Sequence, residues 1–142
     1  MENNFSVRRA GDDKLDLALI QKEKSASLII ILAYIILINS ANKEREIILK
    51  KQRGINTSND LEPTQLVVLS SSLALVGNIF LGEIAFARLR ELQKNIQSGE
   101  SNFSITPNLN ITTGFIFSIL GSIFKTIGVI QRANEQAQIT IL

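Results

Sequence analysis

The chain has 142 residues, with 15 Lys and Arg, 13 Asp and Glu, and a formal net charge of +2. Its length limits it to one domain, and so small a charge, spread over every polar segment, does not favour nucleic-acid binding. The sequence contains no Cys and no His, which removes the usual ligands of zinc, haem and iron–sulfur clusters and the Ser–His and Cys–His pairs of many hydrolases. We therefore expect no metal, no cofactor, no catalytic residue and no enzymatic activity.

The distribution of charge along the chain indicates the fold class. Charged residues are nearly absent from three long windows and crowd the segments between them. A window of about 20 residues matches the ~30 Å hydrocarbon layer of a membrane. The sequence predicts an all-α, polytopic membrane protein with three transmembrane helices at about 25–42, 63–87 and 112–131. A polar or amphipathic segment (1–24) precedes this membrane domain (25–131), and a polar tail (132–142) follows it.

The N-terminal segment has apolar residues at helical spacing between Leu15 and Ile20. They predict a short amphipathic helix that begins after Asp12 as its N-cap. This helix has too few apolar residues to span a membrane. Two placements stay open, either flat on the membrane surface or as an extension of the first transmembrane helix.

The first window, 25–42, carries no charge and has an apolar centre over 28–38. Its flanks bring it to spanning length, and its apolar centre favours a full span over a re-entrant or interfacial segment. The charged segment 43–53 keeps helical character. Gly54 is typical of a helix C-cap and precedes a turn-rich loop over 55–61.

The second window begins at Pro63, which suits the first turn of a helix, and it is rich in small residues. Small residues at membrane depth predict close helix packing. We expect this helix to continue beyond the membrane and to end near Ser98 and Gly99. Its intramembrane polar residues are Ser70, Ser71, Ser72, Asn78 and Glu83.

A polar connector over 100–110, interrupted by Pro107, leads to the third window. Within this window one row of residues recurs at steps of three and four, which places it on a single helix face. Small residues on such a face allow another helix to approach, and a lysine at membrane depth should face protein or water rather than lipid. We call this row the Lys125 stripe, and it consists of Gly114, Ser118, Gly121, Lys125, Gly128 and Arg132.

The Lys125 stripe has two interpretations, which can coexist. As a packing face, it contacts the second helix or a neighbouring subunit. As a pore lining, it surrounds an aqueous path with rings of Lys125 and Arg132, and such rings favour anions. Asn78 is nearer than Glu83 to the level of Lys125 and is its expected partner. Glu83 is expected at the membrane boundary or paired with a basic residue of another helix.

The sequence favours a self-assembling integral membrane protein, most simply a homo-oligomeric ion channel or membrane-permeabilising pore with anion preference, lined by the third helix. The alternative is a non-conducting structural or accessory subunit of a larger membrane complex. The expected partners are the lipid bilayer, further copies of the chain and a possible second membrane protein, in the cell membrane. Basic residues are nearly balanced between the two sides, so the positive-inside rule leaves the orientation open.

Overall fold

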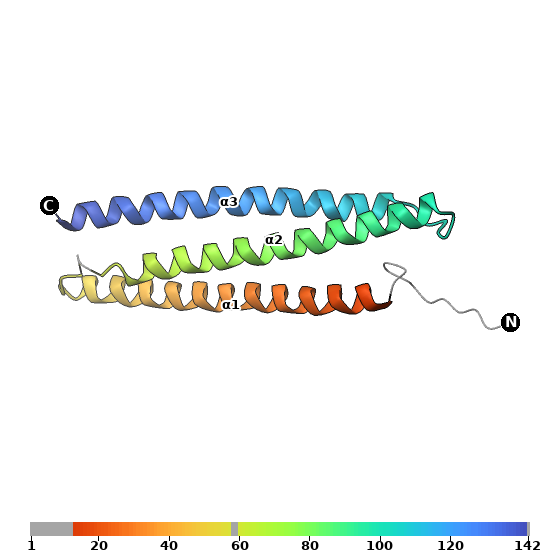
Figure 1. Ribbon diagram of the computed structural model, residues 1–142. Helices are drawn as coiled ribbons and strands as arrows, with labels where there is room; N and C mark the ends of the chain where they lie inside the picture. Colours follow the sequence, from red (N-terminus) through yellow and green to blue (C-terminus); the bar gives the residue numbers. More distant parts are fainter. Residues whose placement is uncertain (1–12, 58–59, 142) are drawn as a thin grey trace.

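The computed structural model describes residues 13–57 and 60–141 and contains three long helices (Figure 1). Helix α1 spans Asp13–Gln52, α2 spans Glu62–Gln97 and α3 spans Thr106–Ile141. Consecutive helices run antiparallel, and α2 lies between the other two. Both α1 and α3 pack on α2, and within the described ranges no Cα atom of α1 comes within 8 Å of one in α3. The fold is all-α, as the sequence predicts, and α2 is its centre.

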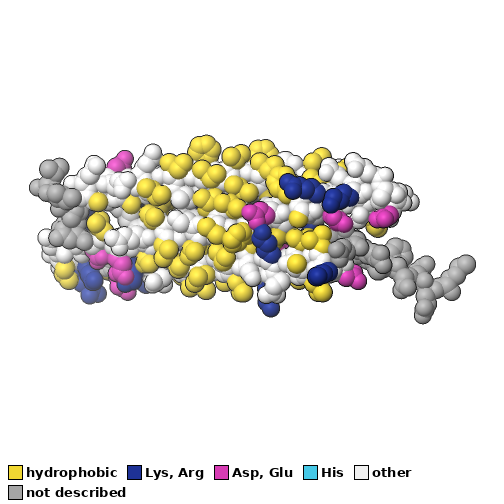
Figure 2. All heavy atoms as spheres, viewed as in Figure 1, with side chains coloured by type: hydrophobic (Ala, Val, Ile, Leu, Met, Phe, Trp, Pro, Cys, Tyr) yellow, Lys and Arg dark blue, Asp and Glu magenta, His cyan; other side chains and the backbone are white. Residues whose placement is uncertain are grey.

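Each of the three helices is long and apolar enough to cross a membrane. Hydrophobic side chains from all three spread over the middle of the face seen in Figure 2, and charged side chains are denser toward its ends. Within the most apolar window of α3 only 6% of the residues are buried in the molecule, compared with 28% for α2. So much exposed apolar surface is unusual for a protein surrounded by water and normal for one surrounded by lipid.

Of the two placements left open for the N-terminal segment, the described residues show the extension of the first helix and not a separate short helix. Residues 13–24 are the first turns of α1, continuous with the apolar window 25–42, and the described residues contain no separate amphipathic helix before it. The physical reason is that neither Gly nor Pro occurs between Asp13 and Arg53, so nothing interrupts the helix. The predicted N-cap Asp12 and the residues before it lie outside the described ranges.

The predicted ends of α1 and α2 are confirmed. Gly54 and Gly99 each follow the last turn of a helix and adopt φ of 77°, a conformation that favours glycine. The Ile55 N–H donates to the carbonyl of Lys50 (3.1 Å), which satisfies one of the open carbonyls at the end of α1.

The predicted start of the third helix is too late. Helix α3 begins at Thr106, so Pro107 belongs to its first turn and the connector covers only 98–105. Proline is tolerated there because the first-turn N–H groups have no partner within the helix. At its other end, α3 continues through the polar segment after Arg132 as far as Ile141.

Small residues bring the backbones of α1 and α2 close together. Ser40 Oγ donates to the carbonyl of Pro63 (2.7 Å), and Ser70 Oγ donates to the carbonyl of Ala33 (2.8 Å). At Gly77 an added Cβ would lie 2.5 Å from Ile30 Cγ1. The buried contact residues recur every seven positions, the spacing of helices that wind gently around each other. They are Leu19, Ala26, Ala33 and Ser40 on α1, and Pro63, Ser70, Gly77 and Ile84 on α2.

A second seam with the same spacing joins α2 to α3. Thr126 Oγ1 donates to the carbonyl of Ser71 (3.3 Å), so these two residues lie opposite each other. Gly82 accommodates Ile119, whose Cδ1 would be 2.8 Å from an added Cβ. The seam residues include Ser71, Asn78 and Ala85 on α2, and Thr112, Ile119 and Thr126 on α3.

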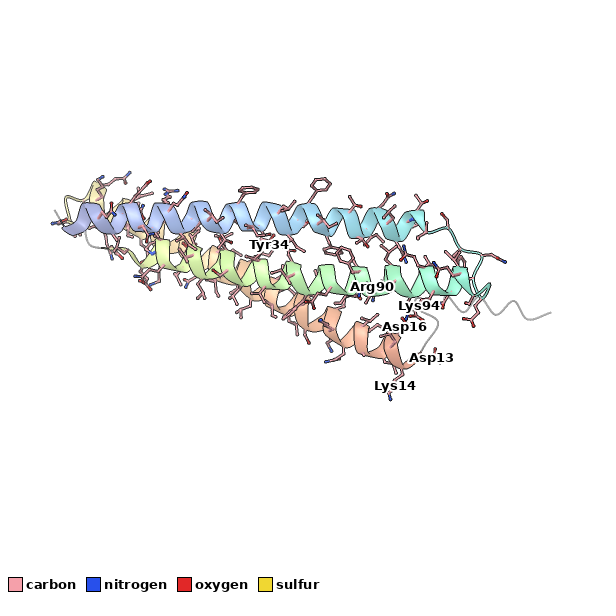
Figure 3. The ribbon with its side chains drawn as sticks, turned by 45° about the horizontal axis from the view of Figure 1, so that its top comes forward. Asp13, Lys14, Asp16, Tyr34, Arg90 and Lys94 are labelled. Carbon is pink, nitrogen blue, oxygen red and sulfur yellow. The ribbon has the colours of Figure 1, made fainter. Side chains whose placement is uncertain are left out.

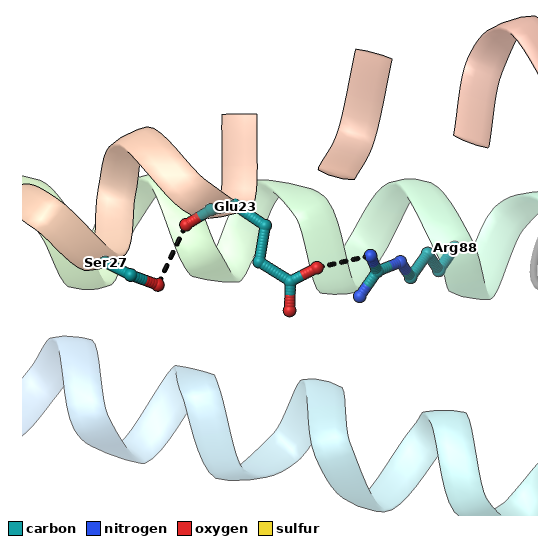
Figure 4. Close-up of polar contacts among 3 residues, drawn as sticks. All are labelled: Glu23, Ser27 and Arg88. Carbon is teal, nitrogen blue, oxygen red and sulfur yellow. Dashed lines mark hydrogen bonds and ion pairs between the residues drawn. The ribbon is translucent and has the colours of Figure 1, made fainter. Parts of the chain in front are cut away.

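Ion pairs hold α1 to α2 at both ends of their contact. Glu23 of α1 pairs with Arg88 of α2 (2.5 Å), and Ser27 Oγ donates to the carbonyl of Glu23 one turn away (Figure 4). At the opposite end Lys43 and Glu62 pair at 2.7 Å. The hydrogen bond to Glu62 raises the pKa of Lys43. Both pairs lie just outside the charge-free window 25–42 of α1.

Candidate functional site

A long groove between α1 and α3 follows from the register of the two seams. The α1 seam uses Ser70 and Gly77 of α2, and the α3 seam uses Ser71 and Asn78, which are the next residues along the chain. Successive residues of a helix are rotated by about 100°, so α1 and α3 pack on neighbouring faces of α2 rather than on opposite ones. The floor of the groove is a third row of α2 residues at steps of seven, Val67, Ala74, Leu81 and Arg88.

The middle of this groove is polar, although it lies among the apolar windows of the three helices. It has a volume of about 360 Å³, and Tyr34, in its α1 wall, lies about halfway along the molecule (Figure 3). Its lining offers four hydroxyl groups, one amide and one ammonium group, and none of the described residues that line it is acidic. We call it the central groove, and its lining residues are Tyr34, Ser71, Ala74, Asn78, Ser118, Gly121, Ser122 and Lys125.

The Lys125 stripe lies beside the α2–α3 seam and not in it. Three of its residues line the central groove, and Arg132 lines the next section of the groove toward the C-terminal end of α1. A Cβ added at Gly114, Gly121 or Gly128 would find no atom within 4 Å. Among the described residues no atom of the second helix lies beside these glycines, so packing of the stripe against a neighbouring subunit stays a prediction. The row of α3 that contacts α2 is a different one, Thr112, Ile119 and Thr126, also at steps of seven.

Lys125 is at the edge of the central groove without a counter-charge. In the described part of the chain it forms no ion pair and no hydrogen bond. Asn78, the expected partner, lines the same groove, but its Nδ2 donates to Ser122 Oγ (2.8 Å). Thr126 and Ser122 lie on either side of Lys125 and contact Ser71 and Asn78, so Lys125 is level with the charge-free window 63–82 of α2.

Glu83 lies away from the central groove. It forms an ion pair with Lys22 of α1, which is one of the two arrangements expected for it. Lys22 also lies over the ring of Phe80, 5.4 Å from its centroid. Together with the Glu23–Arg88 pair, this contact ties the first turns of α1 to the second half of α2. Figure 3 shows Asp13, Lys14, Asp16, Arg90 and Lys94 at this same end of the molecule.

The three consecutive serines of α2 have three different environments. Ser70 donates across to α1, and Ser72 donates to the carbonyl of Val68 in its own helix (2.9 Å). Ser71 is only 2% exposed, and its Oγ has no hydrogen-bond partner among the described residues. The sequence alone does not separate these serines, since the difference arises from the helix that each one faces.

Sequence reasoning missed Tyr34, Ser122 and Thr126 as groove or seam residues. The available signal was the seven-residue spacing of Ala26, Ala33 and Ser40, and of Thr112, Ile119 and Thr126. This spacing identifies the two faces that pack on α2. The groove is then formed by faces of the three helices that lie outside these two contacts.

Comparison of the chain with models of protein families, with curated proteins and with solved structures found no match. Across residues 13–57 and 60–141, no group of three His, Cys, Asp or Glu side chains could hold a metal ion. The functional argument therefore depends on the central groove and the Lys125 stripe.

Proposed function

We propose that this chain is a small integral membrane protein whose helices cross the bilayer at about 25–42, 63–87 and 112–131, and whose copies assemble through α3 into a pore that favours anions. The observation that supports it most is the exposure of the Lys125 stripe. Among the described residues, a Cβ added at any of its three glycines would meet no atom within 4 Å, and its lysine has no counter-charge.

The open glycines favour assembly. A glycine inside a helix costs about 0.5–1 kcal/mol relative to alanine, so a row of them needs a compensating contact. Gly77 and Gly82 have that contact within the chain, because Ile30 and Ile119 occupy the space beside them. The glycines of the Lys125 stripe do not. Helix α3 is also the least buried of the three, so its apolar surface is the most available to a neighbouring copy.

The position of Lys125 favours an aqueous path over a dry interface. Like charges would face each other if two copies met directly through this stripe, and their repulsion in a low-dielectric interface is strong. Several copies arranged around water keep each ammonium group hydrated. A ring of cations at this depth lowers the energy of an anion and raises that of a cation.

A second candidate function is that of a non-conducting accessory subunit. Three cavities lie between α1 and α3, and no further helix in the described part of the chain fills them. A helix of a different membrane protein is one possible occupant. This function requires binding of that protein but no ion flux, which distinguishes it from the first.

Ion flux through liposomes that contain the purified protein tests the channel. We expect the wild type to pass chloride in preference to potassium, and Lys125→Glu to abolish or reverse this preference, because the charge facing the path changes sign. Lys50→Glu is the matched control, since it makes the same change at an exposed end of α1. Wild-type conduction with a selectivity that Lys125→Glu does not alter would remove Lys125 from the pore. Liposomes without flux, combined with capture of a membrane partner, would favour the accessory subunit.

A further inference from the structure

We infer that the central groove binds a small inorganic anion such as chloride between the Lys125 ammonium group and the Ser71 hydroxyl. This inference rests on the proposed function and deepens it, because it places a resting site for the ion inside each chain. The site belongs to one molecule and does not need the assembled pore.

The first observation is the unpartnered hydroxyl of Ser71. Serines in membrane helices ordinarily donate to a carbonyl of the preceding turn or of a neighbouring helix. Ser72 and Ser70 do so, yet Ser71 Oγ makes no such bond to any described residue and is almost completely buried. A buried polar group without a partner is costly, so a hydrogen-bond acceptor beside Ser71 would stabilise the protein.

The second observation is the chemistry of the surrounding groove. Its lining combines one positive charge with several hydrogen-bond donors and, among the described residues, no acidic side chain. One donor of the Asn78 amide is taken by Ser122, and the Ser118 and Tyr34 hydroxyls remain beside the cavity. Such a lining carries one net positive charge, and each of its hydroxyl groups can donate a hydrogen bond. The ligand that balances it is an acceptor with negative charge.

The depth of the groove indicates what kind of anion fits. Lys125 is level with the charge-free window of α2, whereas the phosphates of lipid headgroups lie outside the hydrocarbon layer. At this depth the attraction between an ammonium group and a counter-ion is weakly screened, so a desolvated halide gains more there than in water. A halide also has no directional requirement. It can accept from Ser71 and Lys125 on different helices at the same time.

Chloride binding to the full chain in detergent tests the site, with ³⁵Cl NMR line broadening as the readout. We expect saturable broadening for the wild type and its loss in Lys125→Gln. Removal of the hydroxyl in Ser71→Ala should weaken binding about fivefold, because one hydrogen bond to the anion is lost. Ser72→Ala is the matched control, because Ser72 donates within its own helix, and Lys50→Gln controls for general loss of charge. Both controls should bind as the wild type does.

The test separates this site from the proposed pore. Saturable binding that depends on Lys125 and Ser71, in a protein that gives no flux, would support the site and contradict the channel. Flux that depends on Lys125, without saturable binding or with binding indifferent to Ser71→Ala, would support the channel and overturn the site. Circular dichroism reports whether each variant is folded. If Ser71→Ala does not fold, Ser71→Cys preserves the volume with a weaker donor and should weaken binding in the same direction.

Discussion

At the scale of single residues, the glycines of this protein divide into two kinds with opposite consequences. Gly77 lies where the backbone of α1 comes closest, and an added Cβ would meet both the Ile30 side chain and, at 3.2 Å, the carbonyl of Ala26. Gly114 faces open space. The same substitution should therefore have opposite effects on the stability of the isolated chain.

Gly77→Ala should lower the free energy of unfolding by about 1–3 kcal/mol, because overpacking forces α1 and α2 apart. Gly114→Ala should raise it by about 0.5–1 kcal/mol, since alanine is the better helix former and meets nothing. Unfolding of the detergent-solubilised monomer, followed by circular dichroism, measures both. Equal effects of the two substitutions would contradict the α1–α2 register.

The candidate site also shows what single residues reveal from the sequence alone. The rarity of a lysine at membrane depth identified Lys125, and the structure places it on the central groove. Ser71 could not be singled out between Ser70 and Ser72, because its missing hydrogen bond depends on a neighbouring helix. Asn78 was assigned to Lys125 by depth alone. Depth does not say which way a side chain turns, and Asn78 turns to Ser122.

At the scale of the helices, the composition of the sequence predicts that the helices exist and how many there are better than it predicts where they begin and end. The three windows of low charge correspond to three helices, and Gly54 and Gly99, each with a positive φ, follow the ends of the first two. The errors lie where a residue has two roles. Proline is unfavourable inside a helix but suits the first turn, so Pro107 lies within α3 and not before it. The change from polar to apolar residues near Ser25 does not end α1, because the helix contains no Gly or Pro there.

The exposed stripe of α3 leads to a prediction about assembly. Gly121→Leu should reduce the oligomer at least severalfold, because a large side chain blocks close approach at the middle of the stripe. Ile127→Leu changes an exposed residue on another face of the same helix and should leave the oligomer unchanged. Chemical cross-linking in detergent and in liposomes measures both. An undiminished oligomer with Gly121→Leu would mean that the Lys125 stripe is not the contact between copies.

At the scale of the whole molecule, the proposed three crossings would place the two connectors on opposite sides of the membrane. Single cysteines introduced as Arg53→Cys and Glu100→Cys occupy exposed positions at the two ends of α2. In sealed vesicles, a membrane-impermeant thiol reagent added outside should label one of them and not the other. Labelling of both from the same side would leave α2 as a segment that does not cross. The native chain contains no cysteine, so no background labelling arises.

The register of the two seams has one more consequence. Ser70 lies opposite Ala33 and Ser71 lies opposite Thr126, so Ala33 and Thr126 are nearly level. Ala33 is at the middle of the charge-free window 25–42. Thr126 is four to five residues past the middle of 112–131, an offset of about 7 Å at the helical rise.

This offset implies a tilt of the molecule in the membrane. Helices packed at about 8–10 Å on adjacent faces of α2 hold α1 and α3 about 13 Å apart. To bring both windows into one hydrocarbon layer, the molecule must lean by about 30°, within the range of tilts that membrane helices adopt. The central groove would then cross the bilayer obliquely, as a slanted path rather than an upright one.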